Sequence, residues 1–236
     1  MWLQPHTRDS FQIIWSFIMD IENLKKTILF RNMSESEVYS ALYALTASER
    51  TYSRDKVILH AGDKTDEMGL VLDGSVRIES NDIWGNRTIL SHVGTGQVFA
   101  ETFALVPDEP LLVDAVANQA CRVLMLRIGA LNRPNPDLSV WRYKLISNVL
   151  NISMRKNLML SGRSFHTSPK TIRGRVMSYL SSISLQEGSD EFDIPFDRQQ
   201  LADYLNVERT ALSKELGRMQ RDGLITVRKN HFKLDP

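Results

Sequence analysis

The spacing of apolar residues divides this chain into helical and β-prone regions. Between residues 22 and 46 apolar side chains recur at helical intervals, and Ser34 in the segment NMSESEV is placed to cap a second helix. From residue 50 to residue 126, short β-prone runs are separated by glycine turns, with no βαβ alternation. This pattern favours an antiparallel barrel or jelly roll and gives no sign of a parallel sheet.

A long helix is expected after this region. Pro134 and Pro136 mark a boundary, and from Asp137 to about Ser164 apolar residues recur every three or four positions. The apolar seam that we assign consists of Leu138, Trp141, Leu145, Val149 and Ile152. The residues that widen this seam are Ile146, Leu150 and Met154. Such a stripe often pairs with a second copy of the helix. Packing of the helix on the chain's own barrel is the alternative. Both contacts can exist at once if different faces of the helix make them.

The next helix is expected to begin near Thr167, with Ser168 as its N-cap and Pro169 in the first helical position. Residues 186–193, QEGSDEFD, are polar and predict a loop.

Two short helices joined by a tight turn follow in residues 197–219, DRQQLADYLNVERTALSKELGRM. Asp197 can cap the first helix, and Gln200, three residues later, can reach back to it. Asn206 falls at the turn, where its tolerance of a left-handed backbone is useful. In the second helix an apolar face recurs at intervals of four and three residues, formed by Leu212, Leu216 and Met219.

The outward face of this second helix carries polar residues and no acid. Its members are Arg209, Thr210, Ser213, Lys214 and Gly217. Such a face suits the DNA major groove, although two-helix corners also occur in enzymes that bind no DNA. Beyond Gly223, residues 224–227 and 231–234 predict two strands joined by a turn at Lys229-Asn230, which completes a winged helix.

Charge supports a DNA partner for this region. From Asn206 to Lys233 there are seven basic and three acidic residues, a local net charge of +4, whereas the whole chain of 236 residues carries +1. Positive charge gathered on one module is what phosphate binding requires.

Two further features bear on where the protein works. The single cysteine, Cys121, excludes an internal disulfide framework and predicts an inert core thiol, so a reducing cytoplasm is the expected setting. The apolar run Phe11–Met19 is too short to span a membrane, and no small-residue cleavage site follows it. Residues 1–20 are treated as an N-terminal extension of undecided role.

The order of barrel, long helix and winged helix resembles the Crp/Fnr family of bacterial transcription regulators, the catabolite-activator type. The resemblance covers residues 22–234. It is carried by three segments, YSRDKVILHAGDKTDEMGLVLDGSVRI, GTGQVFAETFAL and FDIPFDRQQLADYLNVERTALSKELGRMQRDGLI.

This resemblance implies an α+β fold with four parts. Residues 1–20 are the extension, and residues 21–133 form an effector-sensing, double-stranded β-roll that resembles cyclic-nucleotide-binding domains. A dimerisation helix spans 134–166, and a winged helix-turn-helix spans 167–236. The implied partners are a double-stranded DNA operator, a second copy of the chain, RNA polymerase and a small-molecule effector.

The resemblance also implies three groups of site residues. The predicted DNA-binding residues are Arg198, Gln199, Arg209, Thr210, Ser213, Lys214 and Lys229. The predicted effector-binding residues are Gln97, Glu101, Thr102, Leu111 and Leu112. The predicted dimer interface is formed by Trp141, Leu145, Val149 and Ile152.

The effector segment departs from the pattern of the family's cyclic-AMP binders. Those proteins carry Gly-Glu at the start of the segment and Arg-Ser near its end, whereas this chain has Ala100-Glu101 and Leu111-Leu112. Without the arginine nothing obvious neutralises a cyclic phosphate, so cyclic AMP is not expected as the ligand. The apolar replacements favour a less charged effector, such as an aromatic compound or a small organic acid, although they can equally be barrel core.

Three alternatives to an effector-controlled regulator differ in what they require of the sequence. A barrel-type metal-dependent enzyme needs clustered histidines, but His6, His60, His92, His166 and His231 are scattered, so neither a metal site nor a cofactor is expected. The oxygen-sensing branch of the family needs an N-terminal cysteine cluster, which residues 1–40 lack. A regulator without a small ligand is the third possibility. No enzymatic activity is expected.

Overall fold

The computed structural model describes residues 21–81, 84, 87–106, 108–132 and 139–235. It separates into two compact units between Met154 and Arg155, and each unit is described by itself. The expected extension at residues 1–20, the prolines at 134 and 136, and the expected helix start at 137 lie outside the described residues. The predicted division into four parts stays a prediction.

The N-terminal unit begins with two short helices, as predicted. These are α2, Ile21–Lys26, and α3, Glu35–Ala44. Ser34 caps α3: its hydroxyl accepts a hydrogen bond from the Glu37 backbone, and the Glu37 carboxylate accepts one from the Ser34 backbone. This reciprocal pair satisfies N–H groups that the first turn of a helix otherwise leaves free.

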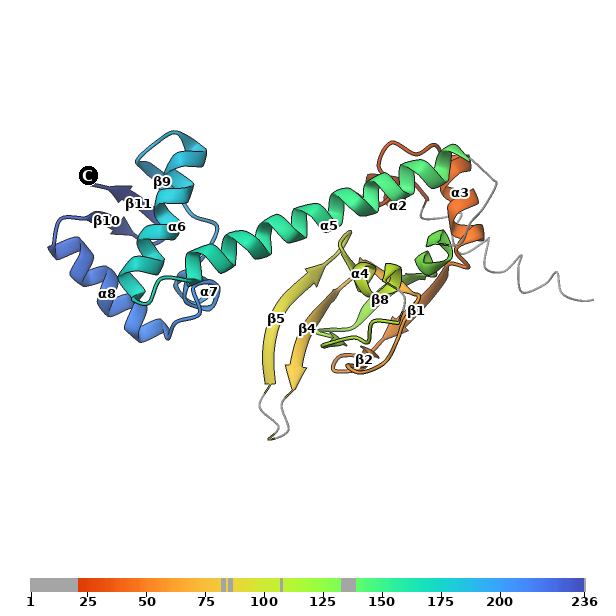
Figure 1. Ribbon diagram of the computed structural model, residues 1–236, viewed down its shortest axis with the longest axis horizontal. Coiled ribbons are helices and arrows are strands. Elements are labelled where there is room, and N and C mark those ends of the chain that lie inside the picture. Colours follow the sequence, from red (N-terminus) through yellow and green to blue (C-terminus); the bar gives the residue numbers. More distant parts are fainter. Residues whose placement is uncertain (1–20, 82–83, 85–86, 107, 133–138, 236) are drawn as a thin grey trace, which may run out of the picture. The chain divides into compact units, whose positions relative to one another are not determined.

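Two antiparallel sheets form the predicted β-roll (Figure 1). One sheet has the order β1-β8-β3-β6 and the other β2-β7-β4-β5. The strands are β1 Ser48–Tyr52, β2 Val57–Leu59, β3 Met68–Asp73, β4 Ser75–Asn81, β5 Arg87–Gly94, β6 Val98–Phe99, β7 Asp114–Ala117 and β8 Cys121–Leu126. Between β6 and β7 lies α4, Glu101–Leu105, and a 3-10 helix, η1, covers Ile128–Asn132.

Gly74 makes the sharp turn between β3 and β4 possible. Its φ is +78°, and a Cβ there would lie 2.4 Å from the Ala120 carbonyl oxygen, so only glycine fits. The glycine in LDGSV, part of a segment that carries the family resemblance, therefore has a steric cause. Cys121 is buried in the cluster between the sheets, and burial raises the pKa of its thiol, as an inert core cysteine requires.

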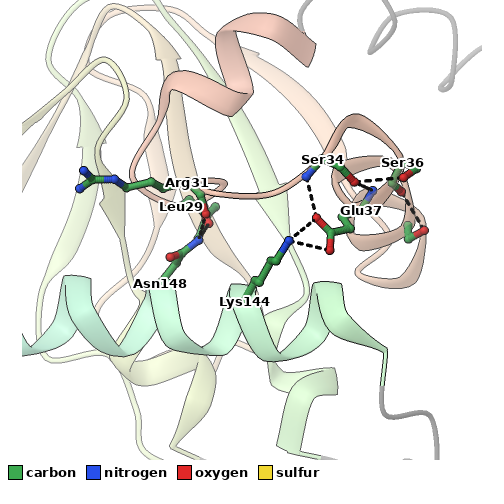
Figure 2. Close-up of polar contacts among 8 residues, drawn as sticks. Leu29, Arg31, Ser34, Ser36, Glu37, Lys144 and Asn148 are labelled. Atoms are coloured by element: carbon green, nitrogen blue, oxygen red, sulfur yellow. Dashed lines mark hydrogen bonds and ion pairs between the residues drawn. The ribbon is translucent and has the colours of Figure 1, made fainter.

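Helix α5, Val140–Thr167, contributes its first half to the N-terminal unit. Figure 2 shows how it is attached to the segment before and within α3. The Lys144 ammonium donates to both Glu37 carboxylate oxygens, each at 2.8 Å, and the Asn148 amide donates to the carbonyl oxygens of Leu29 and Arg31, each at 2.9 Å. The same Glu37 thus completes the α3 cap and holds α5.

The predicted dimer seam needs correction because its side chains are used inside the chain's own domain. Leu145, Val149 and Ile152 are buried in the core cluster that α2 and α3 also line, and Trp141 packs against this cluster. Leu145, Val149 and Ile152 therefore have little surface left for a partner, whereas Trp141 stays partly exposed. Among the apolar residues left exposed on this helix are Tyr143, Ile146, Leu150, Met154 and Leu158.

The C-terminal unit contains the predicted winged helix-turn-helix. Its elements are α6 Ile172–Glu187, β9 Glu191–Asp193, α7 Arg198–Tyr204, α8 Arg209–Arg221, β10 Ile225–Arg228 and β11 His231–Leu234. The three strands form one antiparallel sheet in the order β10-β11-β9. Apolar side chains from all of these helices and strands share one core cluster.

Two details of this unit differ from the sequence prediction. The N-cap of α6 is Thr171, not Ser168: the Thr171 hydroxyl accepts from the Gly174 backbone at 3.0 Å, three residues later than expected. The segment predicted as a loop contains β9, in which Phe192 pairs with Phe232 of β11 and is buried. A single apolar residue between acids was too weak a pattern to predict a strand.

Within the described residues, no helix has the combination of length and apolar character needed to cross a membrane. The same residues hold no group of three or more His, Cys, Asp or Glu side chains arranged for a metal ion.

Candidate nucleic-acid interface and effector segment

The turn between α7 and α8 has the geometry that its sequence predicts. The Asp197 carboxylate accepts from the Gln200 backbone at 2.8 Å, and the Gln200 side chain accepts from the Asp197 backbone at 2.9 Å. Asn206 has a φ of +53°, in the left-handed region. These local contacts fix where α7 begins and where the chain turns, and thereby set the direction in which α8 leaves.

Helix α8 separates its two faces sharply. Leu212, Leu216 and Met219 are buried in the unit's core. The four residues of α8 among the seven predicted to meet DNA, Arg209, Thr210, Ser213 and Lys214, are all exposed. The structure therefore leaves them available on the surface of one helix, as a major-groove reading helix requires.

Acidic side chains of this region are engaged elsewhere. Glu215 pairs with Arg173 at 2.7 Å and with Arg218 at 3.3 Å, and Asp222 pairs with Arg173 at 2.7 Å. These contacts hold the pKa of Glu215 below its ordinary value. Because Arg173 on α6 and Arg218 together pair with these two carboxylates, the negative charge is balanced where it lies, and the outward face of α8 stays positive.

The wing joins the start of α7 to this basic face. Arg198 donates to the Lys229 carbonyl oxygen at 3.2 Å, and its guanidinium lies 5.9 Å from the centre of the Phe232 ring. Burial, and then repulsion from Arg209, lower the pKa of Arg198. Arg198, Arg209 and the turn at Lys229 thus lie near one another, and their binding of phosphate stays a prediction. Gln199 instead bonds Asp203 on its own helix, at 2.8 Å.

Sequence analysis missed the residues that hold the helix-turn-helix in place. On α5, Arg163 donates to the carbonyl oxygens of Asp203 and Tyr204, and His166 bonds the Tyr204 hydroxyl at 2.9 Å. On α6, Arg175 donates to the carbonyl oxygens of Pro169, Leu205 and Asn206. Their acceptors are mainly backbone oxygens, which leave no signal in a sequence.

A charged cluster on the wing predicts pH-dependent stability. His231 on β11 bonds Glu191 at 3.0 Å and Asp193 at 3.1 Å, both on β9, and these carboxylates raise its pKa above the ordinary value. A histidine whose pKa is raised in the folded state stabilises the fold at pH values below its unfolded-state pKa of about 6.5. This stabilisation is lost as the pH rises through the folded-state pKa. The Tm difference between wild type and His231→Gln should therefore be larger near pH 6 than near pH 9.

His166, whose pKa is lowered by burial, contributes to stability with the opposite pH dependence. Because wild type and His231→Gln both contain His166, its contribution cancels in their Tm difference. The matched control is His92→Gln, an exposed histidine on β5. A Tm difference for His231→Gln that is constant between about pH 6 and pH 9 would contradict the prediction.

The predicted effector residues do not gather into one wall. Glu101 and Leu111 are buried, whereas Gln97, Thr102 and Leu112 are exposed, and Leu112 exposes 70% of its surface. The Gln97 side chain accepts from the Gly94 backbone at 2.9 Å and so closes its own turn. Leu112 does not line an enclosed wall here. Whether any of the five contacts an effector stays a prediction.

Ala100 has a backbone conformation that glycine adopts more readily, and glycine stands at this position in the family's cyclic-AMP binders. Its φ is +62°, the left-handed region that disfavours residues with a Cβ, and it directly precedes α4. Glu101 then opens α4, where a carboxylate interacts favourably with the helix N-terminus.

A surface cavity of about 340 Å³ lies beside Leu111. Its apolar part is formed by Ile58, Leu59 and Leu111, and its other lining residues are Arg50, His60, Asp63, Lys64, Thr65, Asp66, Glu67 and Arg127. Three of its cations already have acidic partners: Arg50 and Arg127 lie within 3.5 Å of Glu67, and Lys64 pairs with Asp108. Of the five predicted effector residues, Leu111 lines this cavity.

Two family models match the chain. The cyclic nucleotide-binding domain matches residues 49–133, and the Crp-like helix-turn-helix domain matches residues 174–235. Together these matches cover more than half of the chain and coincide with the β-roll and the winged helix-turn-helix. A comparison with curated proteins gives no match.

Solved structures are similar to this chain, and those with TM-scores of 0.50 or above share its fold. CprK in complex with OCPA is 14% identical, with 82% of this chain and 89% of that chain covered and a TM-score of 0.59. The c-di-GMP-responsive regulator CLP of Xanthomonas campestris is 17% identical, with 86% of this chain and 100% of that chain covered and a TM-score of 0.50. The Thermus thermophilus catabolite activator protein is 23% identical, with 88% of this chain and 93% of that chain covered and a TM-score of 0.47.

The two matched domains occur in the order that the sequence predicts, and each coincides with elements that the structure forms. The chain therefore belongs to the Crp/Fnr family of transcription regulators.

Proposed function

We propose that this protein is a homodimeric transcription factor that reads a two-fold symmetric DNA operator under the control of a small-molecule effector. The observation that carries the proposal is the outward face of α8. It presents Arg209, Ser213 and Lys214 beside Arg198, while Glu215 and Asp222 are paired with Arg173 and Arg218. A helix with this charge distribution is suited to the major groove.

The exposed apolar stripe on α5 supports a homodimer. Ile146, Leu150, Met154 and Leu158 follow one another at four-residue spacing, so they share one helix face. The buried positions Leu145, Val149 and Ile152 occupy the other face. A second copy of this helix would cover the stripe in a coiled-coil manner. A dimer built this way presents two copies of α8 to half-sites about 34–36 Å apart.

The experiment that tests this function is selection of bound DNA from a random pool. We expect enrichment of an inverted repeat whose half-sites are about one helical turn apart, because two-fold protein symmetry imposes two-fold operator symmetry. Enrichment of no sequence, or of a single unrepeated site, would overturn the proposal. The selection needs no knowledge of the natural promoter or of RNA polymerase.

For the effector we propose a molecule other than cyclic AMP, with the β-roll as the sensing domain. The positions where cyclic-AMP binders have Arg-Ser hold Leu111 and Leu112, and the cations that line the cavity beside Leu111 already have acidic partners. A cyclic phosphate would meet the buried Glu101 without a new positive charge to compensate it. An apolar or aromatic compound avoids this cost.

We therefore expect no heat of binding when the full-length protein is titrated with cyclic AMP in a calorimeter. The titration should extend to about 1 mM, a concentration at which binding of about 4 kcal/mol would be detected. Operator binding by the same protein sample is the control for correct folding. A dissociation constant in the micromolar range would contradict the prediction and restore cyclic AMP as the effector.

A further inference from the structure

The N-terminus of α8 is closed by an unusual group, a glutamate. Glu208 is the N-cap: one carboxylate oxygen accepts from the Thr210 backbone at 3.0 Å, and the other accepts from the Ala211 backbone at 2.8 Å. A carboxylate in this place satisfies free N–H groups and interacts favourably with the positive end of the helix. It also occupies the position in which a helix N-terminus would otherwise bind a phosphate.

The same carboxylate determines what Thr210 can offer to DNA. The Thr210 hydroxyl donates to Glu208 Oε2. These hydrogen bonds, first the one from the hydroxyl and then those from the backbone, lower the pKa of Glu208, so it is ionised and has no proton to give. A hydroxyl has one proton. Because Thr210 donates this proton to Glu208, the groups that Thr210 can still offer to a base are its oxygen lone pairs and its methyl group.

We propose that Glu208 is a positioning residue for base reading, which presents Thr210 as an acceptor and a methyl group and thereby selects an A·T base pair. The inference rests on the proposed function, in which α8 lies in the major groove. There an A·T pair offers both an amino donor, on adenine N6, and a methyl group, on thymine. A G·C pair also offers an amino donor, on cytosine N4, but it lacks the methyl group beside that donor, and its guanine edge offers acceptors alone, which Thr210 held in this way cannot satisfy.

A plain capping role for Glu208 is the competing explanation, and two substitutions separate the roles. Glu208→Ser keeps a good N-cap but replaces the carboxylate by a hydroxyl, which no longer dictates the direction of the Thr210 hydrogen bond. Glu208→Asp keeps both the cap and the carboxylate. Thr210→Val keeps the shape and the methyl contact but removes the acceptor.

The test measures the affinity of full-length wild type and the three variants for the selected operator and for operators substituted at each half-site position. In wild type we expect one A·T pair whose replacement by G·C weakens binding about fivefold or more, within the usual range for a base contact. At this position alone, discrimination should fall to about twofold in Glu208→Ser and in Thr210→Val and persist in Glu208→Asp.

The outcomes are distinct. Full discrimination by Glu208→Ser at that position would overturn this inference and leave the proposed function intact. An equal loss at every position, together with a lowered Tm, would assign Glu208 a structural role and would likewise overturn it. A wild type that enriches no sequence from the pool would overturn the proposed function as well.

Discussion

Replacing Arg209 by alanine is expected to weaken operator binding about 10- to 100-fold, while binding to unrelated DNA falls only a few-fold. Arg209 is the first residue of α8 and is exposed beside Arg198. An arginine there can make the bidentate contact to guanine, which is typically worth about 1–3 kcal/mol of discrimination. Unrelated DNA loses one positive charge and no base contact, which is why the two losses should differ.

The matched control is Arg221→Ala, which removes the same charge from the last turn of the same helix. This variant should reduce affinity for operator and unrelated DNA alike and make binding less sensitive to salt. Both variants can be measured by fluorescence anisotropy over a series of salt concentrations. Equal losses on the two kinds of DNA for Arg209→Ala would show that Arg209 contacts phosphate alone.

The parts of this fold that sequence patterns predicted well are those set by neighbouring residues. Asp197 with Gln200, and Ser34 with Glu37, form capping boxes that involve only residues three positions apart. Asn206 and Lys229 have the positive φ values, +53° and +59°, that their turns required. Such features are local, so the printed sequence contains everything that determines them.

The parts that were missed depend on distant residues. β1 has the polar sequence SERTY and is a strand because β8 pairs with it, from Ser48 opposite Met125 to Tyr52 opposite Cys121. β9 is likewise recruited by β11. Arg163 and Arg175 are anchored on backbone oxygens of residues about 30 to 40 positions away. No window of sequence around these residues indicates such partners.

The candidate sites show the same limit. The basic face of α8 follows from helical periodicity, but the pairing of Glu215 and Asp222 with Arg173, which leaves that face positive, comes from another helix. On α5, two apolar faces have helical spacing, and periodicity cannot tell which of them the chain's own domain buries. The contacts of Lys144 and Asn148 with the N-terminal segment decide it (Figure 2).

This assignment of faces leads to the second prediction, that Leu150→Glu converts the protein from a dimer to a monomer at micromolar concentration. Leu150 exposes 57% of its surface in the single chain, between Tyr143 and Met154 on the uncovered stripe. In a two-fold dimer the substitution would place two like charges in a dry interface, where unpaired charges cost several kcal/mol. The folded chain itself should tolerate it, because the side chain already meets water.

Two control variants make the prediction specific to this stripe. Leu185→Glu changes a leucine of α6 that exposes 84% of its surface and should leave the dimer intact. Leu145→Glu buries a charge in the core of the N-terminal unit, where Leu145 is fully buried, and should lower Tm strongly instead of producing a folded monomer. Sedimentation velocity gives the mass of each variant, and thermal melting gives its stability.

Operator binding then connects assembly to function. A Leu150→Glu monomer retains the intact α8 surface but reaches one half-site at a time, so it loses the gain in effective concentration that a linked second site provides, commonly a factor of about 100 or more. Its affinity for an isolated half-site should equal that of wild type. A Leu150→Glu protein that sediments as a dimer, or a wild type that sediments as a monomer, would overturn the assignment of this stripe. The dimer contact would then have to lie elsewhere, because Leu145, Val149 and Ile152 are already buried in their own domain.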